Sequence, residues 1–324
     1  MNKEIIETNF NSEREFKLNG RVLWLTEDPK LVREQLEGAD FAFVAPNLLA
    51  KNVSTDEIIP SRHCFNYTPQ NLGEFALTGF RGDVIKPGDL KRNYFKLIVS
   101  GSSFGSGSSR EHAPIALKGA GINLVASQSL ERIFLQNSQN VGLVTIDNFN
   151  DLISLINNKT ISKEKLFQNL DPISKDILSH GNLLSYIKAR LEGKITLPKI
   201  ETGARPMTLA EKIIASHWVN PDGTTGRVAV KPGDSGFIKA DFQYGYELST
   251  PLGYQALQEI FGQNFNIQNR KQTVLFADHT ALLEAKTPEQ ARDVAKLHQI
   301  QREFAKRFGI KLYPSSVGIC HNVV

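Results

Sequence analysis

A glycine- and serine-rich loop next to an arginine is the part of the chain best suited to chemistry. The loop runs from Gly101 to Ser109 and leads into Arg110 and a Glu-His pair that opens a predicted helix. Glycines let backbone amides approach a ligand, and amides at a helix N-terminus attract anions. A guanidinium binds carboxylates through two parallel hydrogen bonds. With the hydroxyls of Ser108 and Ser109, this pattern predicts a site for a small di- or tricarboxylate.

Two other interpretations fit the composition of this loop. A flexible linker is also rich in Gly and Ser, but a linker is not followed at once by charged residues and a regular apolar pattern. A phosphate-binding loop is possible as well, although the lysine of the P-loop motif is absent.

The elements around the loop alternate between strand and helix. Apolar runs predict strands at 96–100, 122–126 and 143–146, and helical spacing predicts helices between them, from Arg110 and over 130–141. Strands are also expected at 21–25 and 41–44, with a helix over 28–36. This order is typical of an α/β fold.

Composition narrows the class of protein. The chain has 324 residues, 40% hydrophobic and 22% charged, which suggests two domains of ordinary globular type. A net charge of +4 gives no reason to expect nucleic-acid binding. Two cysteines, no apolar signal-peptide core and no apolar run of about 18 residues predict a cytoplasmic protein without a membrane span. We expect domains at 1–193 and 207–324, joined by a linker at 194–206 that is rich in Pro and Gly.

The loop belongs to a longer motif that resembles a known family. The motif comprises the segment 105–114, Arg132-Ile133-Phe134, Asn137 and the segment 140–143. It is similar to the small subunit of isopropylmalate isomerase and to the swivelling C-terminal domain of aconitases. The resemblance implies a β/β/α swivel domain.

A second motif lies at 54–60. Relatives carry Asp-Thr-Asp-x-Ile-Ile-Pro there, and this chain keeps Thr55 and Asp56 but has Ser54 in place of the first Asp. The substrate-selecting loop of the family follows and corresponds to 61–66. Many relatives have an aromatic-Leu pair where this chain has His63-Cys64, so the substrate stays open. Without the resemblance, a solvated turn explains Arg62 and His63 equally well, and Cys64 is better explained as a buried thiol.

The second half resembles the beginning of the large subunit of the same enzymes. We therefore expect an incomplete α/β/α domain after the swivel domain. The matching segments are 207–213, Pro232-Gly233-Asp234, Ser249-Thr250-Pro251, Asp278-His279 and Gly318-Ile319 with His321.

The resemblance also implies roles for single residues. Ser108 would be the catalytic base, acting as an alkoxide, and Asp278 with His279 fits the general acid. Taken alone, the Asp278-His279 pair is better explained as a turn at a strand end. His321 resembles a further active-site histidine. The residues expected to bind substrate are Ser109, Arg110, Arg62, Thr55 and Asp56.

The cofactor of the family is a 4Fe-4S cluster held by three cysteine thiolates. This chain has only Cys64 and Cys320, in no Cys-x-x-Cys spacing, so we expect no metal ligands in it. A cluster-bearing large-subunit segment or chain would complete the enzyme. Two functions stay open: a hydro-lyase that acts on a hydroxy di- or tricarboxylate, and a non-catalytic carboxylate-binding or assembly module. No nucleic-acid or membrane partner is expected.

Overall fold

The computed structural model describes residues 15–82, 84–107, 110–281 and 287–324. It divides into two compact units. The first extends up to Asn169 and includes Ile177–Leu183; the second comprises Leu170–Asp176 and Leu184–Val324. None of the described helices is long and apolar enough to cross a membrane. The predicted domain and linker boundaries stay predictions, as does the relation of 207–324 to a large subunit.

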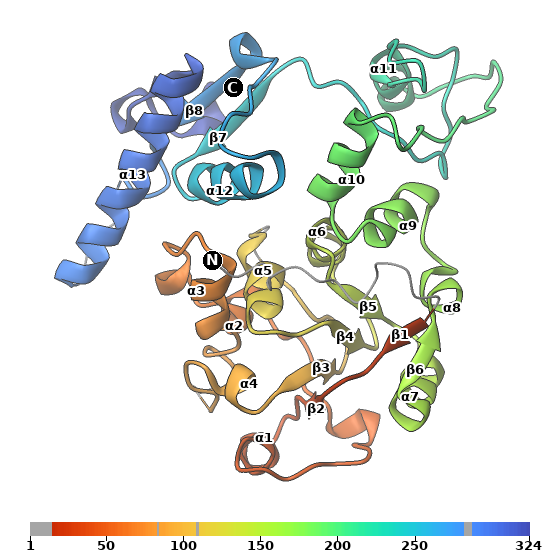
Figure 1. The fold of residues 1–324 in the computed structure, drawn as a ribbon, viewed down its shortest axis with the longest axis vertical. Helices are drawn as coiled ribbons and strands as arrows, with labels where there is room; N and C mark the ends of the chain where they lie inside the picture. Colours follow the sequence, from red (N-terminus) through yellow and green to blue (C-terminus); the bar gives the residue numbers. More distant parts are fainter. Residues whose placement is uncertain (1–14, 83, 108–109, 282–286) are drawn as a thin grey trace. The chain divides into compact units, whose positions relative to one another are not determined.

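A four-stranded parallel sheet forms the centre of the first unit (Figure 1). Its strands follow the chain in the order β2 (Arg21–Trp24), β3 (Phe95–Ser100), β4 (Leu124–Ser127) and β5 (Val144–Ile146). All four residues of β4 are buried, as expected for a parallel strand covered on both faces. The predicted α/β class is confirmed.

Helices connect these parallel strands. A sequential strand order with right-handed crossovers places α5 (His112–Gly119) and α6 (Arg132–Val141) on the same face of the sheet. The two helices contact each other, and α7 (Phe149–Asn158) contacts β4 and β5. Residues 101–107 therefore leave the carboxyl end of β3 on the way to α5, which is where α/β folds commonly place a ligand site.

The outer strand β2 is held by α1 (Pro29–Leu36). Asp28 caps this helix by accepting a hydrogen bond from the Lys30 amide. The buried Gln35 side chain accepts from Trp24 N at 2.8 Å and donates to Trp24 O at 2.9 Å. Gln35 thus satisfies backbone groups of β2 where no further strand pairs with it among the described residues.

The strand predicted at 41–44 is wrong, because these residues form neither helix nor strand. Phe41 O accepts a hydrogen bond from Trp24 Nε1 at 3.0 Å, and the Phe43 ring lies edge-on to Trp24 at 5.8 Å. The apolar run exists because it covers Trp24, and Phe43 is still 52% exposed.

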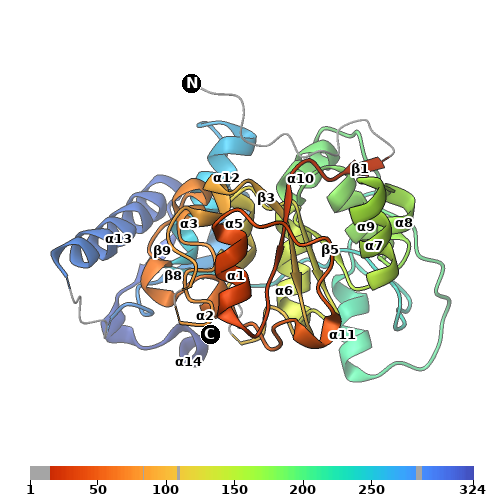
Figure 2. The ribbon, with the colours of Figure 1, turned by 90° about the horizontal axis from the view of Figure 1, so that it is seen from below.

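Short helices precede the sheet strand β3. One of them, α3 (Pro69–Glu74), lies beside α5 in Figures 1 and 2 and contacts it directly. A Cβ on Gly119 would lie 1.7 Å from Pro69 O, and one on Gly73 would lie 2.1 Å from the carbonyl carbon of Gly119. Only glycine permits this spacing. The other short helices are η1 (Pro46–Leu48), α2 (Thr55–Ile58), η2 (Ser61–His63) and α4 (Asp89–Arg92).

An antiparallel strand pair completes the first unit. It joins β1 (Glu15–Lys17) to β6 (Thr160–Ser162). The helices that follow are α8 (Lys163–Phe167), α9 (Pro172–Ser179) and α10 (Leu183–Leu191). Residues 192–208 form no helix or strand.

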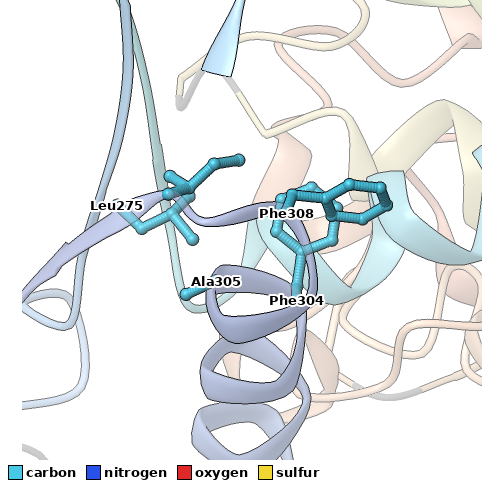
Figure 3. Close-up of a cluster of buried hydrophobic side chains, with 5 residues drawn as sticks. Leu275, Phe304, Ala305 and Phe308 are labelled. Carbon is cyan, nitrogen blue, oxygen red and sulfur yellow. The ribbon is translucent and has the colours of Figure 1, made fainter. Parts of the chain in front are cut away.

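The second unit contains a three-stranded parallel sheet in the order β7 (Gln243–Tyr246), β8 (Thr273–Phe276) and β9 (Lys311–Tyr313). The helix α12 (Ser249–Phe261) follows β7, and α13 (Pro288–Phe308) precedes β9. Figure 3 shows Leu275 of β8 facing Phe304, Ala305 and Phe308 of α13. This cluster fixes α13 against the sheet.

Before this sheet, α11 (Leu209–His217) begins with a capping box. Thr208 Oγ1 accepts from the Glu211 amide, and the Glu211 carboxylate accepts from the Thr208 amide. Trp218, directly after the helix, packs with Ala215 and Val230. The remaining short elements are η3 (Arg270–Gln272), η4 (Ser315–Val317) and α14 (Cys320–Val323).

Candidate functional site

The glycine-rich loop is anchored to the segment before α2 by backbone hydrogen bonds. Gly105 N donates to Val53 O at 2.8 Å, and Thr55 N donates to Ser106 O at 2.8 Å. Ser54 caps α2 through a complete capping box with Glu57. The two motifs singled out in the sequence therefore lie against each other, and Thr55 is buried between them.

A phenylalanine of α6 supports the loop from the other side. Gly105 has a φ of +82°, and a Cβ at this position would lie 2.2 Å from Cγ of Phe134. The Phe134 ring in turn meets Phe104 edge-on at 5.2 Å. Gly107 also has a positive φ, +100°, but the nearest atom to its Cβ would be Thr55 Oγ1 at 3.5 Å.

Arg110 and Asp56 form an ion pair beside this loop. Nη1 of Arg110 lies 2.9 Å from Oδ1 of Asp56 and 3.9 Å from Sγ of Cys64. Side-chain exposure is 26% for Arg110 and 58% for Asp56, so the pair faces solvent. Ser108 and Ser109 lie outside the described residues, and the roles expected for them stay predictions.

The segment at 61–66 packs around a histidine. The His63 ring stacks on Phe75 at 3.9 Å with an interplanar angle of 6°, and Arg62 Nε donates to His63 Nε2 at 3.1 Å. Burial, followed by the Arg62 charge, lowers the pKa of His63 to about 4. Cys64 is buried, and burial raises its pKa against the opposing effect of Arg110. His63 is therefore neutral and Cys64 is a thiol at neutral pH.

His112, the histidine of the Glu-His pair after Arg110, is a buried polar residue for which the sequence predicted no role. Its exposure is 2%, and neither ring nitrogen has a hydrogen-bond partner in the structure as far as it is described. Burial, with a smaller contribution from the Arg110 charge, lowers the pKa of His112 to about 4. The first turn of α5 consequently carries a neutral imidazole.

Asp278 and His279 form a second group of site residues, in the second unit. Oδ1 of Asp278 lies 2.8 Å from Nδ1 of His279, and Oδ2 accepts a hydrogen bond from Cys320 N at 2.5 Å. Burial opposes ionisation of Asp278, but these hydrogen bonds outweigh it and lower the pKa of Asp278. The carboxylate stays ionised and fixes the His279 ring, which also stacks on Tyr246 at 3.8 Å.

His321 lies next to this pair. Its ring centroid is 5.9 Å from that of His279, and its Nδ1 lies 3.3 Å from the Tyr244 hydroxyl. The structure thus brings together all three candidates of the second unit. It also places donor atoms of His279, Cys320 and His321 within 4.8 Å of one another, as it does for Glu247, Asp278 and His279.

Glu247 organises the turn that carries these residues, and the sequence motifs did not reveal it. Its fully buried carboxylate accepts hydrogen bonds from Asp278 N at 3.1 Å, Thr280 N at 2.5 Å and Thr280 Oγ1 at 2.7 Å. Glu247 follows β7 as Asp278 follows β8. Since the carboxyl ends of parallel strands meet at one edge of a sheet, this shared position was the signal that could have identified Glu247.

The residues present do not fit a 4Fe-4S cluster. Such a cluster needs three thiolates. The chain contains Cys64 and Cys320, which are both buried and lie in different units. These two cysteines therefore do not supply the ligand set of a cluster.

Comparison with known proteins agrees with the sequence motifs of the first unit. Residues 86–151 match the model of the Aconitase C-terminal domain. The isopropylmalate/citramalate isomerase small subunit of Methanocaldococcus jannaschii is 38% identical over 157 residues, which cover 43% of this chain and 89% of that protein. The 3-isopropylmalate dehydratase small subunit of Aliarcobacter butzleri is 36% identical, covering 44% and 92%.

Among solved structures, the chain is similar to a crystal structure of 3-isopropylmalate dehydratase from Methanocaldococcus jannaschii. That match has 31% identity and a TM-score of 0.37, and it covers 45% of this chain and 92% of that one.

Proposed function

Because the chain belongs to the isopropylmalate dehydratase small-subunit family of the aconitase superfamily, we propose that it is the substrate-holding part of a hydro-lyase. The reaction would remove and restore water on a hydroxy di- or tricarboxylate. The observation that carries this proposal is the solvent-facing Arg110 fixed beside the anchored glycine-rich loop.

Arg110 is built to hold a carboxylate in one orientation. Both of its contacts with described side chains use Nη1, through Asp56 and Cys64, so Nε and Nη2 are the nitrogens that a substrate carboxylate would engage. A guanidinium with one nitrogen already paired has little rotational freedom left, which lowers the cost of a two-point contact. Asp56 is therefore a positioning residue in this scheme, with Thr55 supporting the loop beneath.

Ser108 is the proposed base. A serine hydroxyl gives up its proton only where the alkoxide is strongly stabilised, and amides fixed in advance provide such stabilisation. The loop before Ser108 is held by Val53, Thr55 and Phe134 and so has little freedom to reorganise. Arg110 adds a positive charge two residues later, and Ser109 supplies a second hydroxyl for the substrate.

Asp278 and His279 are the proposed acid, with His321 as a further histidine of the site. The Asp278 carboxylate orients the His279 ring, and an oriented imidazole suits proton donation to a leaving hydroxyl. The electrophile has to come from a cluster-bearing large-subunit segment or partner chain, because the two cysteines of this chain do not provide it.

The substrate class is set by the segment at 61–66. Cys64 touches Arg110 at 3.9 Å, and His63 is fixed on Phe75, so this segment contacts the proposed carboxylate clamp directly. A thiol and an imidazole are smaller and more polar than the aromatic-Leu pair of many relatives. We therefore propose that the substrate be identified by comparing turnover of 2-isopropylmalate, citrate and homocitrate.

The isolated chain has only two cysteines, too few to hold a 4Fe-4S cluster, and this favours a second function for it. That function is carboxylate binding or subunit assembly without turnover. The Arg110 clamp needs no cluster to bind an anion. Isothermal titration of the chain with citrate and 2-isopropylmalate tests this function. Arg110→Lys should weaken binding, since an ammonium cannot make the two parallel bonds.

Anaerobic reconstitution with a cluster-bearing large subunit tests the hydro-lyase. Ser108→Ala should abolish dehydration of the preferred substrate, while Ser106→Ala is the matched control in the same loop. Ser106 contributes its backbone carbonyl to Thr55 N, which alanine preserves, so this variant should retain turnover. Equal turnover in Ser108→Ala and the unmodified chain would remove Ser108 as the base.

A further inference from the structure

We propose that the second unit binds one zinc-class divalent metal ion through His279, Cys320 and His321. The spacing of the cysteines offers no reason to expect a metal ligand, because neither belongs to a Cys-x-x-Cys pair. The fold nevertheless brings three possible metal ligands together. The turn after β8 places His279 at the start of α14, where Cys320 and His321 are adjacent.

The three donors are close enough for a shared ion. Sγ of Cys320 and one ring nitrogen each of His279 and His321 lie within 4.8 Å of one another. Zinc bond lengths of about 2.0–2.3 Å place tetrahedral ligands about 3.3–3.8 Å apart. Small shifts of the two exposed imidazole rings, with their Nδ1 contacts kept, would close the remaining gap, and Cys320 is held in place in the core.

Outer partners already orient the two histidines. Asp278 engages Nδ1 of His279 at 2.8 Å, and the Tyr244 hydroxyl lies 3.3 Å from Nδ1 of His321. In a complex both rings would therefore bind through Nε2. Metal-bound histidines usually carry a carboxylate, carbonyl or water on the other nitrogen, and such partners raise the basicity of the ligand. Asp278 also fixes the Cys320 backbone, so one carboxylate positions two of the three ligands.

The neighbouring carboxylates do not compete as ligands. Glu247 is fully buried and accepts three hydrogen bonds from residues 278 and 280. Both oxygens of Asp278 are engaged by His279 and Cys320. Two imidazoles and one sulfur select zinc, cobalt or similar ions over Mg²⁺ and Ca²⁺, which prefer oxygen ligands. Three protein ligands leave a fourth position for water or a carboxylate.

This site does not rest on the proposed hydro-lyase activity. A metal on Nε2 of His279 would occupy the nitrogen that a proton donor needs, so metal binding and proton donation by His279 exclude each other. The test uses the chain without a large subunit and follows metal binding. Its failure therefore leaves the dehydration assay unaffected, and failure of that assay leaves the metal site unaffected.

Titration of the full chain with Zn²⁺ by calorimetry, and with Co²⁺ by absorption, tests the site. We expect one ion per chain, a thiolate-to-cobalt charge-transfer band, and release of the Cys320 proton on binding. Asp278→Asn should weaken Zn²⁺ binding about 10–100-fold, as loss of an outer partner does. His321→Ala should weaken it more than Asp278→Asn, and Cys320→Ser should remove the charge-transfer band.

Matched controls come from the same chain. Cys64→Ser removes the other buried thiol, and His217→Asn removes a histidine that pairs with Asp241 at the surface. Both variants should still bind one metal ion per chain and show the same Co²⁺ absorption spectrum as the unmodified chain. His321 is exposed, so His321→Ala is expected to fold even where Cys320→Ser does not. Zn²⁺ binding that is unchanged in His321→Ala, or a Co²⁺ complex without a thiolate band, would overturn the proposal.

Discussion

Replacing Gly105 by alanine tests how firmly the glycine-rich loop is seated on α6. The backbone at Gly105 has a φ of +82°, and its new Cβ would lie 2.2 Å from the Phe134 ring. A left-handed conformation costs a non-glycine residue about 1–2 kcal/mol. Overpacking of a buried contact adds about 1–3 kcal/mol. Gly105→Ala should therefore lower the free energy of unfolding of the first unit by about 2–5 kcal/mol.

Gly107→Ala is the matched control for this variant. Its φ is also positive, but the nearest atom to the new Cβ lies at 3.5 Å, which is ordinary contact. Only the conformational cost of about 1–2 kcal/mol should remain. The difference between the two variants then measures the clash with Phe134 alone.

The assay has to report on the first unit by itself. Trp24 is fully buried in β2, and Trp218 lies in the second unit. Urea unfolding followed by Trp24 fluorescence in a Trp218→Phe background gives the stability of the first unit. Equal losses for Gly105→Ala and Gly107→Ala would refute the reasoning, since the loop would then not rest on Phe134.

Three further changes test other parts of the structure. The folded-state pKa of His112 is about 4, below the ordinary 6.5, so the folded chain binds fewer protons than the unfolded one. Stability should therefore fall by up to about 3 kcal/mol as pH drops from 6.5 to 4. His112→Gln should flatten that slope in urea titrations, and an unchanged slope would contradict the burial of a neutral imidazole. Thr208→Ala removes the capping box of α11 and should cost about 0.5–2 kcal/mol, measured by Trp218 fluorescence in a Trp24→Phe background. No loss there would mean that α11 does not depend on its cap. Asp278→Ala should cost about 1–3 kcal/mol and remove the hydrogen-bonded His279 Nδ1–H signal from the NMR spectrum, and a retained signal would assign another partner to that proton.

The long helix α13 shows what local sequence can predict. Its Thr287 cap, Pro288 at the first position and Gly309 directly after the last turn are signals that mark both ends of the helix in the sequence. The strands β3, β4 and β5 were predictable for a similar reason, because short apolar runs between glycine-rich turns leave little choice. The bounds of these elements can be predicted because they depend on residues that are neighbours in the sequence.

The features that the sequence did not predict depend on contacts between residues that lie far apart in the chain. The run at 41–44 is apolar because it covers Trp24, and a strand pattern cannot be told from such a covering segment by composition. Glu247 lies about 30 positions before the residues it organises, so only the strand order of the sheet reveals it. The pairing of Asp56 with Arg110 spans 54 positions and could be expected only from the family motif.

The contact between Gly73 and Gly119 has a consequence for engineering the protein. With 1.7 Å from a Gly119 Cβ to Pro69 O, α3 and α5 cannot be varied independently. His63 rests on Phe75 at the end of α3, whereas Arg110 lies just before α5. The selectivity segment and the carboxylate clamp therefore share one fixed spacing. A chimera that imports residues 61–66 from a relative should import the chain through Phe75 together with α5, and directed evolution of selectivity should leave both glycines untouched.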